Sequence, residues 1–148
     1  MRLAEVTAQN VRDACALRIT PEQGGMVAPV AESLAEAYVA RDIAWPRLIY
    51  DCDQLVGFLM GGFAPTTDPP LFHCIVWRLL IAAEHQRKGY GRFAVQSMIE
   101  EARRRGHARL TATWSTAEHG PEFFWRKLGF RPIEDWDGRG EAPGELYF

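Results

Sequence analysis

A run of eight residues near the middle of the chain has the composition of an anion-binding turn. It reads His85-Gln86-Arg87-Lys88-Gly89-Tyr90-Gly91-Arg92, and it lies between an apolar segment and a segment with helical periodicity. Two glycines separated by one residue let the backbone turn tightly and bring successive N–H groups toward one point, where they and the following helix end can hold a phosphate. The three cationic side chains add positive charge. The segment therefore predicts an anion-binding turn, with a plain strand-to-helix connection as the alternative.

The glycine spacing excludes two common phosphate-binding motifs. A P-loop has a longer gap between its glycines and then Lys followed by Ser or Thr, whereas Lys88 is followed by Gly89. The dinucleotide fingerprint needs a third glycine and a downstream acid, and neither is present. A nucleotide-binding module is therefore a poor alternative. The pattern Gln86-x-x-Gly89-x-Gly91, between a strand and an amphipathic helix, resembles the acetyl-CoA-binding motif of the GNAT family of N-acetyltransferases.

Two further stretches strengthen this resemblance, which covers most of the chain from Leu3 to Phe148. The run Phe123-Phe124-Trp125-Arg126-Lys127-Leu128-Gly129-Phe130 looks like the late helix of the family, which usually ends in Phe-Tyr-x-x-x-Gly-Phe. Upstream, Met26-Val27-Ala28-Pro29 and Ser33-Leu34-Ala35-Glu36-Ala37-Tyr38 are similar to the bacterial subgroup that acetylates diamines, spermidine and spermine. The resemblance implies an α/β (α+β) fold: a mixed, largely antiparallel sheet of six to seven strands, splayed where acetyl-CoA enters, with helices on both faces.

The resemblance also implies where acetyl-CoA binds as co-substrate, without a metal. The pantetheine arm is expected to bond to exposed backbone near Leu79, Leu80 and Ile81. The pyrophosphate is expected at the turn formed by Gln86, Arg87, Lys88, Gly89, Tyr90, Gly91 and Arg92.

The catalytic groups depart from the family pattern. Acetyl transfer needs a neutral amine and a proton for the departing thiolate. The family's tyrosine acid corresponds here to Trp125, whose indole N–H can only donate a hydrogen bond. Water or the substrate ammonium would then protonate the thiolate. Glu118 and His119 follow the strand expected to border the acetyl group, and they could bind cofactor, move protons or face water.

One histidine is a candidate general base. Strand alternation predicts His73, Ile75 and Trp77 on one face, and of these only His73 titrates near neutrality. A purely structural histidine is the alternative.

The acceptor site is predicted from the polyamine resemblance. Carboxylates would hold remote ammonium groups and aromatic rings would line the alkyl chain. Candidates are Glu32, Glu36, Tyr38 and Trp77. Other small amines, including amino acids, aminosugars and a protein N-terminus, stay open, as does a sensor or interaction module that binds acetyl-CoA without transferring the acetyl group.

Composition sets broad limits. A chain of 148 residues with a formal net charge of -2 favours one domain, residues 1–148, without general attraction to nucleic acid. No apolar run approaches membrane-spanning length, so a cytoplasmic protein is expected. The family resemblance implies a small-molecule amine as the acceptor, and a homodimer is compatible with these expectations. Cys15, Cys52 and Cys74 are odd in number, far apart and without metal-ligand spacing, which argues against a disulfide framework and a zinc site. Each is expected to be a small buried apolar residue.

Periodicity and turn residues predict the order of elements. Strands are expected at residues 2–6, 47–51, 55–61, 71–81, 109–114, 131–136 and 145–148. Helices are expected between a Thr7 cap and Pro21, at 34–41 behind a Ser33/Glu36 capping box, from Gly91 to a Gly106 cap, and from Pro121 to Gly129.

Overall fold

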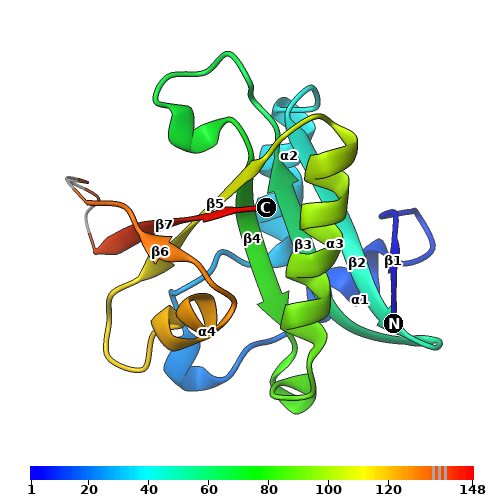
Figure 1. The fold of residues 1–148 in the computed structure, drawn as a ribbon. Coiled ribbons are helices and arrows are strands. Elements are labelled where there is room, and N and C mark those ends of the chain that lie inside the picture. Colours follow the sequence, from blue (N-terminus) through cyan, green and yellow to red (C-terminus); the bar gives the residue numbers. More distant parts are fainter. Residues whose placement is uncertain (135, 137, 139) are drawn as a thin grey trace.

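The centre of the computed structural model, which describes residues 1–134, 136, 138 and 140–148, is one seven-stranded sheet (Figure 1). The strands lie in the order β1-β2-β3-β4-β5-β7-β6, and every neighbouring pair is antiparallel except β4 and β5. Their bounds are Arg2–Ala4 for β1, Ala44–Asp51 for β2, Gln54–Gly62 for β3, Ile75–Ile81 for β4, Arg109–Ser115 for β5, Arg131–Pro132 for β6 and Glu141–Tyr147 for β7. The predicted fold class is confirmed.

Helices cover both faces of this sheet. Ala14 and Val30, from the first two helices, pack with Phe58 of β3 on one face. Met98 and Trp125, from the last two helices, belong to the larger buried cluster on the other face. The helices are α1 (Val11–Ala16), α2 (Val30–Val39), α3 (Tyr90–Arg104) and α4 (Glu122–Lys127), with 3-10 turns η1 (Pro21–Gln23), η2 (Pro70–Phe72) and η3 (Ala83–His85). Side chains alternate across a strand, so β3 contributes to both cores.

The sheet opens between its two parallel strands. β4 pairs with β5 only at Ile75 and Val76, opposite Thr111 and Ala112. β4 then continues along β3 to Ile81, so its other edge has no β5 partner beyond Val76 (Figure 1). This divergence is the splay that the sequence resemblance implies.

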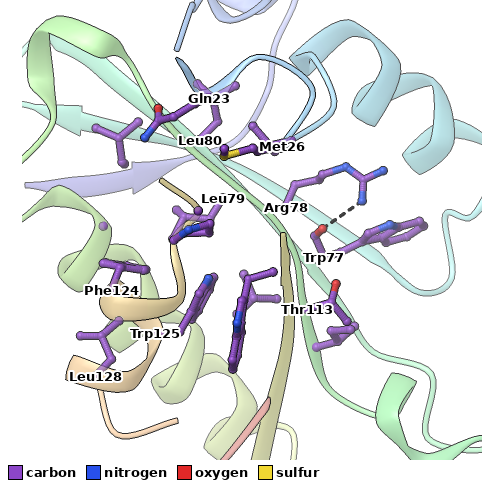
Figure 2. A pocket seen from close by; sticks show the side chains of 18 of the residues that line it. Gln23, Met26, Trp77, Arg78, Leu79, Leu80, Thr113, Phe124, Trp125 and Leu128 are labelled. Carbon is purple, nitrogen blue, oxygen red and sulfur yellow. Dashed lines mark hydrogen bonds between the residues drawn. The ribbon is translucent and has the colours of Figure 1, made fainter. Parts of the chain in front are cut away.

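A bulge interrupts β4 beside the splay. Met60 of β3 pairs with Arg78, while the next residue of β3 pairs with Val76, which leaves Trp77 without an opposite residue. Bulges of this kind redirect side chains. Trp77 packs against the core beneath α1 and α2, and Arg78 bonds to Glu36 of α2, so both leave β4 on the side away from α4 (Figure 2).

The predicted Thr7 cap of the first helix is wrong. The residue before α1 is Asn10, and its side-chain Oδ1 accepts the backbone N–H of Thr7 at 2.7 Å. The carbonyl of Thr7 accepts the N–H groups of Asn10 and Val11, so Thr7 begins a turn that precedes the helix. The helix ends at Ala16, because Leu17 is already extended, well before Pro21.

The predicted capping box before the second helix is also wrong. α2 begins at Val30, one turn earlier than expected, because Pro29 has the extended conformation that precedes a helix. Ser33 therefore lies inside the helix, and its hydroxyl donates to the carbonyl of Pro29 at 3.1 Å. Glu32 lies in the first turn, and Glu36 faces Arg78 of the sheet.

Two strand predictions need correction. The strand expected at 71–81 begins at Ile75, because Pro70 starts the η2 turn and His73 ends it. The strand expected at 145–148 begins at Glu141, and its partner β6 is only two residues long. Part of the arm expected at 131–136 lies outside the described residues.

The two predicted glycine helix caps are confirmed. Gly106 after α3 and Gly129 after α4 have φ values of 84° and 97°, the left-handed region that glycine reaches without strain. The N–H of Phe130 donates to the carbonyl of Trp125 at 3.1 Å, and the two rings meet edge to face at 5.0 Å. This fixes Trp125 at the end of α4.

The three cysteines differ in exposure. Cys74 is buried as predicted, and burial raises the pKa of its thiol to about 12. Cys15 is half-buried, whereas Cys52 is exposed in the β2–β3 turn, which corrects the prediction for that residue. All three are free thiols.

Candidate active site

A cleft of about 1080 Å³ lies where β4 and β5 diverge. Its walls come from β4, the turn before α3, the end of β5, α4 and the loop at residues 23–28 (Figure 2). The cleft thus brings together the two motifs that the sequence singled out, although thirty residues separate them along the chain. Leu79, Leu80 and Ile81, the residues predicted to meet the pantetheine arm, line this cleft.

The glycine turn has the geometry of an anion-binding helix start. Gly89 is the N-cap of α3 with φ 91°, and Arg87 before it also has a positive φ, 62°. The first backbone bond of α3 runs from Phe93 N–H to Gly89 O, so the N–H groups of residues 90–92 have no acceptor within the helix. Arg92 lines the cleft beside them. Backbone donors, helix dipole and cations therefore converge here.

The two glycines have different tasks. A Cβ on Gly89 would meet no atom within 4 Å, so this position needs glycine for its backbone conformation. A Cβ on Gly91 would lie 3.0 Å from Cε2 of Phe124. Gly91 therefore lets α4 approach the start of α3 closely.

Three predicted cofactor residues have structural partners. The Gln86 amide donates to Gln23 Oε1 at 2.7 Å and to the carbonyl of Ile81 at 3.1 Å, which fastens the turn to the loop before α2. The Tyr90 hydroxyl donates to Asp51 at 2.7 Å, and this bond raises the pKa of the phenol, with burial and the Asp51 charge adding to it. Lys88 donates to the carbonyl of Glu84 and is not among the lining residues.

Trp125 lines the cleft from α4 and is 5% exposed. Its ring stacks on that of Trp114, at the end of β5, and meets Phe124 edge to face. Trp114 was missed by sequence reasoning. Its Nε1 is buried and has no hydrogen-bond partner in the described part of the chain, and buried donors of this kind are rare. The only sequence signal was an aromatic residue at the end of a predicted strand.

The predicted base and acid residues do not all reach the cleft. His73 precedes β4, its Nε2 lies 2.8 Å from the carbonyl of Thr67, and it is not a lining residue. The strand alternation on which its assignment rested therefore does not apply to it. The Glu118 side chain is 90% exposed and also lies outside the cleft, whereas its neighbour His119, with φ 63°, lines it.

The predicted acceptor residues are likewise divided. Trp77 lines the cleft, but Glu32, Glu36 and Tyr38 do not. Glu36 forms an ion pair of 3.0 Å with Arg78, a cleft residue that sequence reasoning missed because the contact crosses 42 positions. The carboxylate cluster that a polyamine pocket requires is thus not assembled among the described lining residues.

Two further features bear on the class of site. Among the described residues, no three or more His, Cys, Asp or Glu side chains form a group that could hold a metal ion. None of the described helices has both the length and the apolar character needed to span a membrane.

Comparison with known structures supports the fold. An acetyltransferase from Thermus thermophilus superposes with a TM-score of 0.76 at 20% identity, covering 99% of this chain and 96% of that one. A putative acetyltransferase, yncA, from Salmonella typhimurium, solved with acetyl-CoA, gives 0.71 at 15% identity, covering 99% and 93%. At these identities the likeness is one of fold alone.

Comparison at the sequence level assigns the family. An uncharacterized N-acetyltransferase from Shouchella clausii (strain KSM-K16) is 34% identical over 86 residues, which are 56% of this chain and 47% of that protein. The match thus spans about half the length of that relative. Residues 21–130, well over half of the chain, match the family model described as Acetyltransferase (GNAT) family. With the splayed sheet and the glycine turn in place, the chain belongs to the GNAT family of acetyltransferases.

Proposed function

We propose that this protein transfers the acetyl group of acetyl-CoA to a primary amine of a small molecule. The observation that carries the proposal is that one cleft holds both the edge of β4 that β5 leaves unpaired and the N–H groups at the start of α3. An extended pantetheine arm can bond to a free strand edge, and a pyrophosphate can accept backbone N–H groups at a helix start. Family membership supports the same assignment.

The residues divide by role. We assign the backbone of Leu79, Leu80 and Ile81 to the pantetheine arm. The pyrophosphate is assigned to the turn, with donors and charge from Arg87, Gly89, Tyr90, Gly91 and Arg92. Gln86 holds the shape of this turn through its amide bonds, and Lys88 adds charge outside the lining.

When bound, acetyl-CoA supplies an activated thioester, and the chain has to position the amine and exclude water. The nucleophile is the neutral fraction of the amine, so turnover should rise with pH toward the pKa of the acceptor. Trp125 shapes the wall beside the reacting atoms but cannot supply a proton, because its indole N–H does not ionise in this range. The departing thiolate, only moderately basic, takes its proton from water or from the ammonium formed on the acceptor.

A thiol-release assay tests the proposal. The panel comprises amino acids, short diamines, spermidine, spermine and aminoglycosides, with CoA binding measured in parallel by calorimetry. We expect thiol release with at least one amine class. CoA binding without thiol release in the presence of any of these amines would favour the rival function, an acetyl-CoA sensor or interaction module. The feature that supports this rival is the tryptophan at position 125.

A further inference from the structure

We propose that Arg78 binds a carboxylate of the acceptor, so that the acceptor is an amine that also carries a carboxylate, as an amino acid does. This inference rests on the proposed function, since it concerns the acceptor end of the same cleft. It also selects among the amines that the sequence left open.

Arg78 lies where an acceptor would enter. It follows the β4 bulge and lines the cleft together with Trp77, Met26 and Phe72. In Figure 2 its side chain leaves β4 away from Phe124 and Trp125, which form the wall toward the glycine turn. The expected cofactor path therefore runs along one side of β4, and the Arg78 side chain lies on the other.

The guanidinium is already oriented for a ligand. One terminal nitrogen donates to Glu36 at 3.0 Å, and the other donates to the carbonyl of Trp77 at 3.0 Å. Its Nε is buried and has no hydrogen-bond partner within the described residues. A guanidinium has five N–H donors, so the Nε–H and one hydrogen on each terminal nitrogen are uncommitted. A carboxylate matches this planar set of donors better than any single neutral acceptor.

The charges of the cleft favour the same ligand. Among the described lining residues, Arg78, Arg87, Arg92 and Lys127 are cations, and Glu141 is the only carboxylate. Glu36 is already paired with Arg78 and lies outside the lining. Among these described residues, no carboxylate other than Glu141 lines the cleft, so a second ammonium group, as in a diamine, would meet the guanidinium without a carboxylate assigned to hold it. An acceptor carboxylate would instead be attracted to Arg78.

Such an arrangement also assists the reaction. A cation near the acceptor disfavours the protonated amine and so enlarges the neutral fraction that can attack a thioester. No lining residue has been assigned as a general base. The charge of Arg78 near the acceptor would therefore promote deprotonation of the amine without one.

Matched acceptors separate the carboxylate from the rest of the molecule. Phenylalanine, phenylalaninamide and 2-phenylethylamine share a ring and an amine and differ in the acidic group, and the three alanine counterparts repeat the test at smaller size. Binding to the CoA-saturated protein is measured by calorimetry, and thiol release is measured on the same set with spermidine added. We expect the acids to bind at least about tenfold more tightly than their amides, the size of one charge-assisted hydrogen bond.

Three variants assign that preference to one side chain. Arg78→Gln should bring the ratio of acid to amide affinity close to one, Arg78→Lys should keep part of it, and Arg41→Gln, which removes an exposed arginine outside the cleft, should leave it unchanged. Unaltered CoA affinity and melting temperature certify that the variants are folded.

The outcomes separate this inference from the proposed function. An acid preference that depends on Arg78, without thiol release, would support the carboxylate site and refute the transferase. Thiol release with spermidine, combined with acids that bind no better than amides, would support the transferase and overturn the carboxylate site. An acid preference that persists in folded Arg78→Gln would overturn it as well.

Discussion

Trp114 of β5 and Trp125 of α4 stack with their ring centroids 6.2 Å apart and their planes 17° from parallel. Both rings line the cleft, and the pair joins β5 to α4 in its wall. The position at which the family usually has a tyrosine is therefore held by aromatic packing. Replacing either ring should therefore first affect the packing of this wall.

Trp125→Phe should destabilise the fold but spare catalysis. Loss of the stack with Trp114 should cost about 0.5–1.5 kcal/mol of unfolding free energy, the range measured for aromatic pairs. Turnover per folded molecule should stay close to wild type, because the indole donates no proton. Thiol release and melting temperature, measured on the same samples, check this.

The companion variant Trp125→Tyr supplies a phenol with a pKa near 10. It should raise turnover if thiolate protonation limits the rate. A large loss of turnover in stably folded Trp125→Phe would show that the indole takes part in the reaction.

Gly144→Ala should disturb the packing of Trp114 in the wall of the cleft. A Cβ at this position of β7 would overlap the six-membered ring of Trp114 and lie 3.2 Å from the carbonyl of Arg131. Overpacking of this kind costs about 1–3 kcal/mol. Urea unfolding measures the loss. The double variant with Trp114→Phe should be more stable than the sum of the single effects predicts, since the smaller ring removes the overlap. Strict additivity would argue against this contact.

Gly89→Asp should weaken CoA binding at least about tenfold, because the carboxylate would lie beside the pyrophosphate and repel it. Gly106→Asp is the matched control: its φ of 84° is close to the 91° of Gly89, but it lies at the other end of α3, outside the cleft. Both variants carry similar backbone strain, so calorimetry should report a loss of affinity for the first only. Equal CoA affinities in the two folded variants would refute the assignment of the turn as an anion-binding site.

His107, which follows the Gly106 cap and contacts Phe63, should make stability depend on pH. Burial lowers the pKa of His107 from 6.5, and the nearby charges of His73 and Arg105 lower it further. The unfolded chain therefore binds this proton more readily, so the stabilising contribution is complete above pH 6.5 and is lost as the pH falls toward the folded-state pKa. His107→Gln should flatten urea-unfolding stability between about pH 7 and pH 5 relative to wild type. An unchanged slope would assign the pH dependence to other groups.

The glycine turn, the two glycine caps and the edge-to-face contact of Trp125 with Phe130 could be predicted because each depends on residues close together in sequence. A left-handed position such as Gly89 or Gly129 leaves a signature in residue type alone. The predicted helix starts at Thr7 and Ser33 were wrong. Both residues fit a local capping pattern, but the residues that precede the two helices are Asn10 and Pro29.

The acceptor side could not be predicted, because it depends on contacts between distant segments. The Glu36–Arg78 pair joins α2 to β4, and the β4 bulge that redirects Arg78 is defined by the register against β3. His73 was misplaced because the η2 turn that begins at Pro70 delays the start of the strand to Ile75. No periodicity within β4 reveals a bulge created by its neighbour.

The amide pair between Gln23 and Gln86 has a consequence for the order of binding. The two side chains donate to each other at 2.7 Å and 3.3 Å, and Met26, in the loop that follows Gln23, lines the cleft together with Arg78. A ligand that orders the turn at Gln86 should therefore also order the proposed acceptor surface. We therefore expect acetyl-CoA to bind before the amine and CoA to dissociate last. This order of binding is a compulsory-order ternary-complex mechanism.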